Sequence, residues 1–114
     1  MITVTIEAER ITLSGHAGHG PPGQDIVCAA VTALAQGYIN SLERLTMDEA
    51  RILSEHGFLS VGMKNIISER GNLLTGSFLI GLDCIREEFP ECVRINIKSY
   101  GQAWNPLKAT GTQA

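Results

Sequence analysis

The strongest constraint on the fold is a change of hydrophobic period close to residue 25. Apolar and polar residues alternate over 2–6 and again over 11–14, which is typical of two half-buried strands. From Asp25 onward the apolar residues recur at spacings of three and four, and this pattern predicts a helix that runs to about Leu45. The chain is therefore expected to open with two strands and to continue into one long helix.

The remaining segments extend this pattern to an α+β fold. Residues 50–63 predict a hairpin that turns near His56, and a polar loop that contains glycine follows it. Helical spacing of apolar residues over 74–89 predicts a second helix, which Pro90 ends. Alternation over 93–97 predicts a last strand. The expected order is ββαββαβ, with a mostly antiparallel sheet and two packed helices.

Length and composition limit the chain to a single domain. With 114 residues, of which 44% are hydrophobic, it can bury one core but has little material for a second. We expect a folded domain over 1–98 and a loose C-terminal tail over 99–114, where no period is visible. The net charge of -3 and the aromatic content of 5% argue against a nucleic-acid partner, since such a surface needs a basic face and stacking side chains.

The N-terminal residues and the cysteines indicate the cellular compartment of the protein. The N-terminal residues lack the basic start and the long apolar run of a signal peptide. No stretch approaches the roughly 20 apolar residues that span a membrane. We therefore expect a cytoplasmic protein with no membrane partner, in which the three cysteines stay reduced.

Reactive side chains gather in residues 15–30, "GHAGHGPPGQDIVCAA". Asp25 stands where the helix begins and can cap it, which places Cys28 in the first helical turn. The positive end of the helix dipole favours a thiolate at that position. His16, at the end of a strand, can reach the sulfur if the loop doubles back. A cysteine with a histidine base can carry out acyl transfer, and N–H groups at the helix start would be available to hold the oxyanion.

Plainer interpretations of the same residues stay open. A cysteine in a helix rich in Ala and Val is most often a small core residue, and Gly and Pro between two elements are most often a connection. His16, His19 and Cys28 could also ligate zinc, but a structural site needs a fourth ligand, so we expect no metal. Cys84 and Cys92 are expected to be packing thiols.

Residues 15–34, "GHAGHGPPGQDIVCAAVTAL", resemble the signature of the ribosomal-processing cysteine protease family. In that family GHA is followed by a glycine-rich loop and by a D-I-V-C-A-A-V-S helix start, and the His-to-Cys spacing agrees. The resemblance extends more loosely over 1–98. It implies a small α+β homodimer that removes an N-terminal extension from a large-subunit ribosomal protein, or from a related specific protein. We expect no cofactor.

The resemblance also implies roles for single residues. Cys28 would be the nucleophile and His16 the base that later protonates the leaving amine, with Asp25 as cap and electrostatic support. Thr32, one turn after Cys28, stands where the family usually has Ser. The loop would be a substrate-binding flap that orders over a bound peptide and shields the thioester from water. This flap consists of Ala17, Gly18, His19, Gly20, Pro21, Pro22, Gly23 and Gln24.

Two further features bear on the peptide preference of the flap and on assembly. His19 occupies a flap position where the family often has an aromatic residue, and Pro21 and Pro22 stiffen the backbone beside it. The first half of the long helix, "IVCAAVTALA", is apolar nearly all round, which suits burial against a second subunit. The alternative to a protease is a non-catalytic dimeric module that binds peptides, with Cys28 as a packing thiol.

Overall fold

The computed structural model describes residues 1–64 and 67–99 and has the predicted element order. The elements are β1 (Ile2–Ile6), β2 (Arg10–Gly15), α1 (Ile26–Leu45), β3 (Ala50–Glu55), β4 (Phe58–Met63), α2 (Glu69–Glu88) and β5 (Val93–Ile97). Of the predicted tail, residues 100–114 lie outside the described part of the chain. The α+β class and the ββαββαβ order are thus confirmed.

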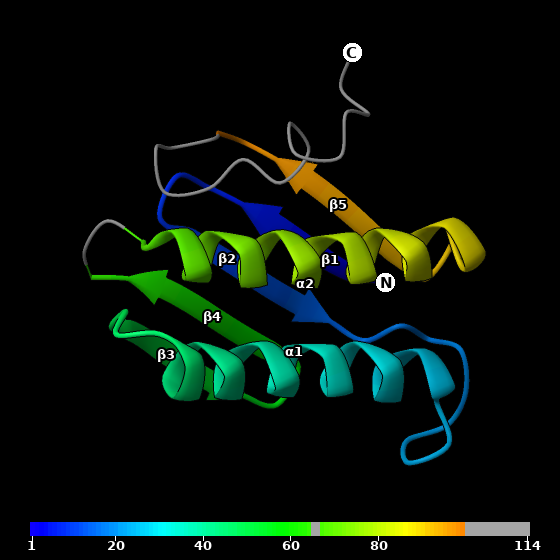
Figure 1. Cartoon of the computed structure of the whole chain (residues 1–114). Helices are drawn as coiled ribbons and strands as arrows, with labels where there is room; N and C mark the ends of the chain where they lie inside the picture. The colour runs from blue at the N-terminus through cyan, green and yellow to red at the C-terminus, as the bar shows by residue number, and fades with distance from the viewer. Residues whose placement is uncertain (65–66, 100–114) are drawn as a thin grey trace.

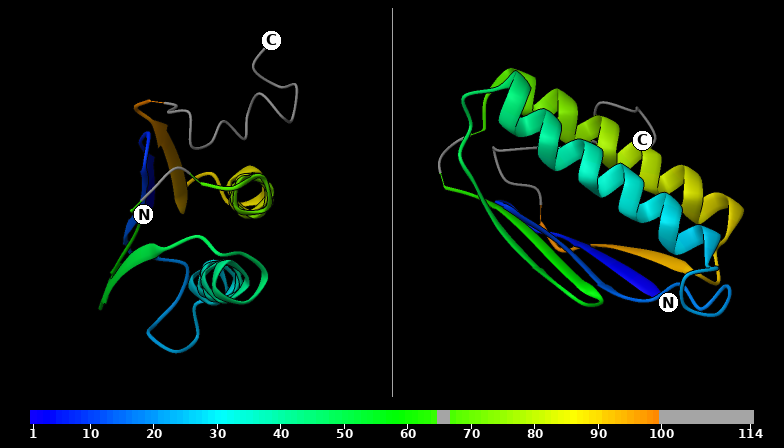
Figure 2. Two further views of the ribbon diagram at one scale, coloured as in Figure 1. Left: turned by 60° about the vertical axis from the view of Figure 1, so that its left-hand side comes forward. Right: turned by 90° about the horizontal axis from the view of Figure 1, so that it is seen from below.

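The strands form one sheet in the order β3-β4-β2-β1-β5. All neighbours are antiparallel except β1 and β5, so the sheet is mixed but mostly antiparallel, as predicted. Both helices cover the same face of this sheet (Figure 1, Figure 2), which makes a fold of two layers. The pairing of β4 with β2 is important for the site, because it carries the β3–β4 turn to the end of β2.

The core lies between the sheet and the two helices. Side chains at alternate positions of β1 and β2 are buried, as the alternation predicts. The buried face of α1 follows the helical period through Val27, Val31, Ala35, Tyr38 and Leu42. This face fixes the rotation of α1 and so decides which side chains of its first turn reach the surface.

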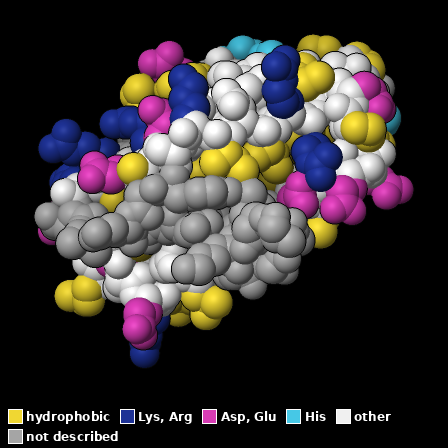
Figure 3. Space-filling view, turned by 90° about the horizontal axis from the view of Figure 1, so that it is seen from above, with side chains coloured by type: hydrophobic (Ala, Val, Ile, Leu, Met, Phe, Trp, Pro, Cys, Tyr) yellow, Lys and Arg dark blue, Asp and Glu magenta, His cyan; other side chains and the backbone are white. Residues whose placement is uncertain are grey.

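On the face shown in Figure 3, the basic and acidic side chains of the described residues are interspersed, and neither charge predominates. Neither α1 nor α2, the helices of the described part of the chain, is long and apolar enough to cross a membrane.

One boundary differs from the sequence prediction, because α2 begins at Glu69 and not near residue 74. The polar loop with glycine was predicted to extend over these residues, and for 69–73 this is wrong. Ser68 caps the helix by accepting from the Gly71 N–H at 3.0 Å, and Asp48 in turn accepts from the Ser68 N–H and hydroxyl. A Cβ at Gly71 would overlap Asp48 Oδ2 and approach Ile67. Glycine therefore permits close packing inside this helix.

A buried contact between the two helices gives a test of the packing. The Tyr38 ring stacks on Phe78 with the ring centroids 4.5 Å apart, and its hydroxyl lies 2.7 Å from Thr75 Oγ1. Burial raises the pKa of Tyr38 to about 12 from an ordinary value of 10.0. The folded protein therefore keeps this phenol neutral at a pH where the unfolded chain ionises it.

We expect stability to fall between pH 10 and pH 12 for this reason. The contribution of Tyr38 is present in full below its unfolded pKa and is lost as the pH rises through the folded value, on the order of 1 kcal/mol by pH 11. Tyr38→Phe should cost about 1 kcal/mol at pH 8, because Thr75 keeps its other hydrogen bond, to the Gly71 carbonyl. Urea unfolding at pH 8 and pH 11 measures both effects. An equal loss in wild type and Tyr38→Phe at pH 11 would contradict the assignment.

Candidate active site

The Cys28 thiol lies in the first turn of α1, where Asp25 caps the helix. Asp25 Oδ1 accepts hydrogen bonds from the backbone N–H groups of Val27 and Cys28, each at 3.0 Å. The Cys28 N–H makes the largest contribution to lowering the pKa of the Asp25 carboxyl below its ordinary value of 3.8. Asp25 is therefore a charged cap at neutral pH, in the capping position that the sequence predicts.

The expectation that N–H groups at the helix start are available for an oxyanion is wrong for two of them. The N–H groups of Val27 and Cys28 already donate to the Asp25 carboxylate, which places a fixed negative charge at the positive end of the helix. A different donor points at the sulfur. The backbone N–H of Ala17, from the loop, donates to Cys28 Sγ at 3.3 Å.

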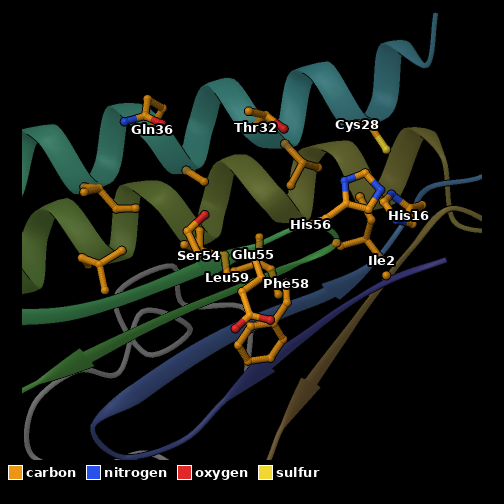
Figure 4. Close-up of a pocket in the computed structure, with 17 residues that line it drawn as sticks. Ile2, His16, Cys28, Thr32, Gln36, Ser54, Glu55, His56, Phe58 and Leu59 are labelled. Atoms are coloured by element: carbon orange, nitrogen blue, oxygen red, sulfur yellow. The ribbon is translucent and has the colours of Figure 1, made fainter. Parts of the chain in front are cut away.

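His16 is brought to the same place by the end of the sheet (Figure 4). It follows Gly15, whose N–H donates to the Gly57 carbonyl at 2.9 Å, and the Met1 amino group donates to the His16 carbonyl. The side chains of His16 and Cys28 line one cleft. Within the described residues no hydrogen bond joins the His16 ring to the thiol. The structure thus gathers the two predicted reactive groups without a direct bond between them.

A second histidine, which the sequence analysis did not assign to the site, stands beside His16. The rings of His16 and His56 have centroids 4.9 Å apart and are tilted by 46°. The hairpin turn near His56 was predicted, but not the strand beside which it would lie. The β2–β4 register pairs Ser14 with Phe58 and so places the hairpin turn next to the residues that follow β2.

The cleft consists of two adjoining cavities of about 530 and 760 Å³. Both are lined by His16, Cys28, Thr32, Gln36 and His56. Cys28, Thr32 and Gln36 follow each other at intervals of four residues, so α1 presents them on one face along the cleft. The spacing could have identified Gln36, but only together with knowledge of which face of α1 is buried.

The two cavities differ in their walls. The smaller one lies between α1 and the β3–β4 hairpin and is lined by apolar side chains such as Val31, Ile52 and Leu59. The larger one lies against the loop and is lined by Gly18, Gly20, Pro22 and Gly23. An extended chain that lies across both would therefore pass the Cys28 sulfur.

The loop that was predicted as a flap is fastened to the body through His19. The His19 ring packs edge-on against Phe89 with centroids 5.0 Å apart, and its Nδ1 lies 3.9 Å from Cys92 Sγ. The His19 N–H donates to Asp25 Oδ2 at 2.9 Å. The tip of the loop, with Pro21 and Pro22, is exposed. One carboxylate thus connects the helix start to the loop.

The other two thiols, Cys84 and Cys92, differ in burial. Cys92 is only 3% exposed, and burial raises the pKa of its thiol, so it is a packing thiol as predicted. The same prediction is wrong for Cys84, which is exposed on α2. The His19 ring, one of the three possible zinc ligands, lies against Phe89. Within residues 1–64 and 67–99 no group of three or more His, Cys, Asp or Glu side chains is placed to hold a metal ion.

We expect Gly57→Ala to slow the reaction of Cys28 while leaving the protein folded. A Cβ at Gly57 would lie 2.8 Å from His16 Nε2, the far end of an exposed side chain, so the imidazole would have to move. The backbone at Gly57 has φ +71, which costs a residue with a side chain roughly 1 kcal/mol. The measurements are the rate of Cys28 alkylation and the urea midpoint.

Gly23→Ala is the matched control for backbone strain. Its φ is +82, and nothing lies within 4 Å of the added Cβ. Both variants should lose similar stability, but Gly57→Ala should be alkylated more slowly at Cys28. Equal alkylation rates would show that the position of the His16 ring does not affect the reactivity of Cys28.

The two-layer fold and the cleft lined by a thiol and an imidazole point to a thiol hydrolase. A sequence model of the family described as Cysteine protease Prp matches residues 1–94, and the chain belongs to this family. The protein is a cysteine protease, as the resemblance in residues 15–34 predicts.

Known relatives agree with this assignment. The chain is 31% identical to the Ribosomal processing cysteine protease Prp of Staphylococcus aureus strain Mu50 over 106 residues, which cover 86% of this chain and 100% of that protein. The crystal structure of the S. aureus protease with a covalently linked product peptide superposes with a TM-score of 0.83 at 31% identity, and covers 86% of this chain and 100% of that one. The protein SMU.848 from Streptococcus mutans gives a TM-score of 0.70 at 34% identity, over 85% and 93% of the two chains.

Proposed function

We propose that this protease removes an N-terminal extension from a large-subunit ribosomal protein, with Cys28 as nucleophile and His16 as base. The observation that carries the proposal is the cleft that both side chains line. The S. aureus relative is a ribosomal processing protease whose structures hold a substrate peptide or a covalently linked product peptide. A ribosomal precursor is made in the cytoplasm, where we also place this protein.

The chemistry proceeds in two halves. His16 takes the proton from Cys28 Sγ, and the sulfur forms a bond to the carbonyl carbon of the scissile peptide. The carbon–nitrogen bond breaks as His16 returns the proton to the leaving amine, which leaves a thioester. His16 then takes a proton from water, the hydroxide attacks the thioester carbon, and the carboxylic acid departs while the thiol is restored. Thr32 lines the cleft one turn from the sulfur, where its hydroxyl can contact the peptide.

The flap is proposed to close over the bound substrate. Gly18, Gly20, Pro22 and Gly23 of the flap line the larger cavity, and the flap would close over a bound peptide. The apolar wall of the smaller cavity, which includes Ile52 and Leu59, suits apolar side chains of the substrate. Closure would exclude water until the amine has left and would bring the His16 ring to the sulfur.

The direct test is incubation of the purified protein with the ribosomal precursor of its own organism. Mass spectrometry should show a shortened protein with one new N-terminus. A binding module without catalysis would instead hold the precursor and leave it intact. Binding without cleavage over many hours would reject the protease mechanism in favour of that alternative.

We also propose that the protein is a homodimer. Ile26 at the start of α1 is 62% exposed and Leu73 on α2 is 75% exposed. Such apolar surface favours burial against a second copy. Sedimentation at micromolar concentration should give twice the chain mass of 12.3 kDa. A single species at the chain mass across the concentration series would reject the dimer.

A further inference from the structure

The backbone N–H of Ala17 is the one hydrogen-bond donor in the described residues that is directed at the Cys28 sulfur. It points at Cys28 Sγ from 3.3 Å, whereas the two helix-start N–H groups nearest the sulfur in sequence donate to Asp25. The Ala17 side chain is 4% exposed and belongs to the hydrophobic core, so the direction of this N–H is set by a buried anchor. The donor is held on the reacting atom by packing and not by a mobile side chain.

We propose that the Ala17 N–H is a catalytic donor that stabilises negative charge on the Cys28 sulfur. The inference rests on the proposed role of Cys28 as nucleophile. A thiolate at Cys28 forms close to the Asp25 carboxylate, which accepts a hydrogen bond from the Cys28 N–H and whose charge opposes the thiolate. A hydrogen bond to an ionised acceptor is about twice as strong as one between neutral groups. The Ala17 N–H therefore favours the thiolate at the point where Asp25 disfavours it.

The same contact acts twice in the reaction. It holds the thiolate that His16 creates before attack on the peptide carbonyl. It also holds the thiolate that is expelled when the thioester is hydrolysed, until a proton returns to the sulfur. Ala17 directly follows His16, so one short segment supplies both the base and the donor. Any movement of this segment would withdraw both groups together.

The experiment removes one N–H and leaves every side chain in place. A synthetic thioester of residues 1–27 can be ligated to recombinant 28–114, because Cys28 is the first residue of that fragment and the junction keeps the native sequence. In the test protein L-lactic acid replaces Ala17, which changes the N–H into an ester oxygen. We expect alkylation of Cys28 by iodoacetamide at pH 7 to slow about tenfold or more relative to the all-amide ligated protein. The value of kcat/KM for the precursor peptide should fall at least as far.

Two controls separate the donor from general damage. The first carries the ester at Glu9, an exposed residue between β1 and β2 whose N–H has no hydrogen-bond partner among the described residues, and should be alkylated at the rate of the all-amide protein. The second is Ala17→Gly, which loses the buried methyl but keeps the N–H, and should be alkylated faster than the lactate protein. Equal loss in Ala17→Gly and the lactate protein would assign the effect to packing and overturn the inference.

The failure of the inference can be told from failure of the proposed function. If the lactate protein is alkylated and cleaves peptide at the all-amide rate, Ala17 is not a catalytic donor, although Cys28 can still be the nucleophile. If blocking of Cys28 by iodoacetamide leaves cleavage by the all-amide protein intact, the nucleophile itself is wrong. The second result overturns both proposals, and the first overturns only this one.

Discussion

Cys28→Ala should show no cleavage of the precursor above background, and His16→Ala should lose about a thousandfold in kcat/KM. Without the sulfur no thioester can form, so the reaction loses its covalent path. Without the imidazole the thiol has no base and the leaving amine no proton donor, and such a pair of functions is worth about 10²–10⁴ in rate. His16 is exposed and Cys28 is only partly buried, so the variants should fold.

Cys84→Ala is the matched control for the cysteine variant. It makes the same substitution on a helix, but Cys84 is exposed on α2 and lines neither cavity of the cleft. Its kcat/KM should equal that of wild type. All three variants should give the wild-type circular dichroism spectrum. Turnover by purified Cys28→Ala, with the mass of the substituted chain verified, would exclude the thioester path.

The elements of the fold could be predicted because they depend on local patterns. Alternation over 2–6 and the helical period after Asp25 report which side of each element is buried, and the structure confirms both. The start of α2 could not be predicted in this way. Gly71 interrupts the apolar pattern, and the reason for a glycine there is its contact with Asp48, which lies over 20 residues earlier in the chain.

In the site, too, some features follow from local sequence and others depend on tertiary packing. The pairing of His16 with Cys28 in one cleft follows from a short segment of sequence. The presence of His56 depends on β4 lying beside β2, and strand order is decided by packing across the whole sheet. The expectation of free N–H groups at the helix start was wrong for Val27 and Cys28, because their N–H groups donate to the capping carboxylate of Asp25. An N-cap carboxylate and an oxyanion site compete for the same N–H groups.

Asp25→Ala should release the flap and the helix start together and should lower cleavage strongly. The two oxygens of this carboxylate have different partners: Oδ1 accepts from Val27 and Cys28, and Oδ2 accepts from the His19 N–H. Loss of both removes the cap and the hydrogen bond that joins His19 of the flap to the start of α1. Hydrogen exchange should rise over 17–24 and over the first turn of α1.

Asp25→Ser separates the two functions of the carboxylate. A serine hydroxyl can cap the helix but cannot also reach the His19 N–H, so exchange should rise over 17–24 while the first turn of α1 stays protected. If cleavage falls as far in Asp25→Ser as in Asp25→Ala, attachment of the flap is the function that catalysis needs. If Asp25→Ser cleaves like wild type, the flap link is dispensable and the cap is the essential part.

The pH dependence of the same variants tests the charge of Asp25. Because the Cys28 N–H above all lowers the pKa of this carboxyl, its stabilising contribution is present above the unfolded value of 3.8 and is lost as the pH falls through the lower folded value. The stability difference between wild type and Asp25→Ala should therefore be constant from pH 5 to pH 7 and should shrink below pH 3.8. A difference that persists unchanged in strong acid would mean that the neutral carboxyl caps the helix as well as the carboxylate does.

Peptide binding should change the mobility of the flap. In the free protein the segment 17–24 is held mainly at Ala17 and His19, while its prolines and glycines are exposed. We therefore expect moderate protection from exchange near Ala17 and His19 and little at the tip, and strong protection throughout when Cys28→Ala protein is saturated with substrate peptide. His19→Ala in the same background should lower the protection of the free flap and leave that of the bound flap largely intact, since the peptide then supplies the contacts. Equal, strong protection with and without peptide would show that the flap is already fixed, and closure would have no part in bringing His16 to the sulfur.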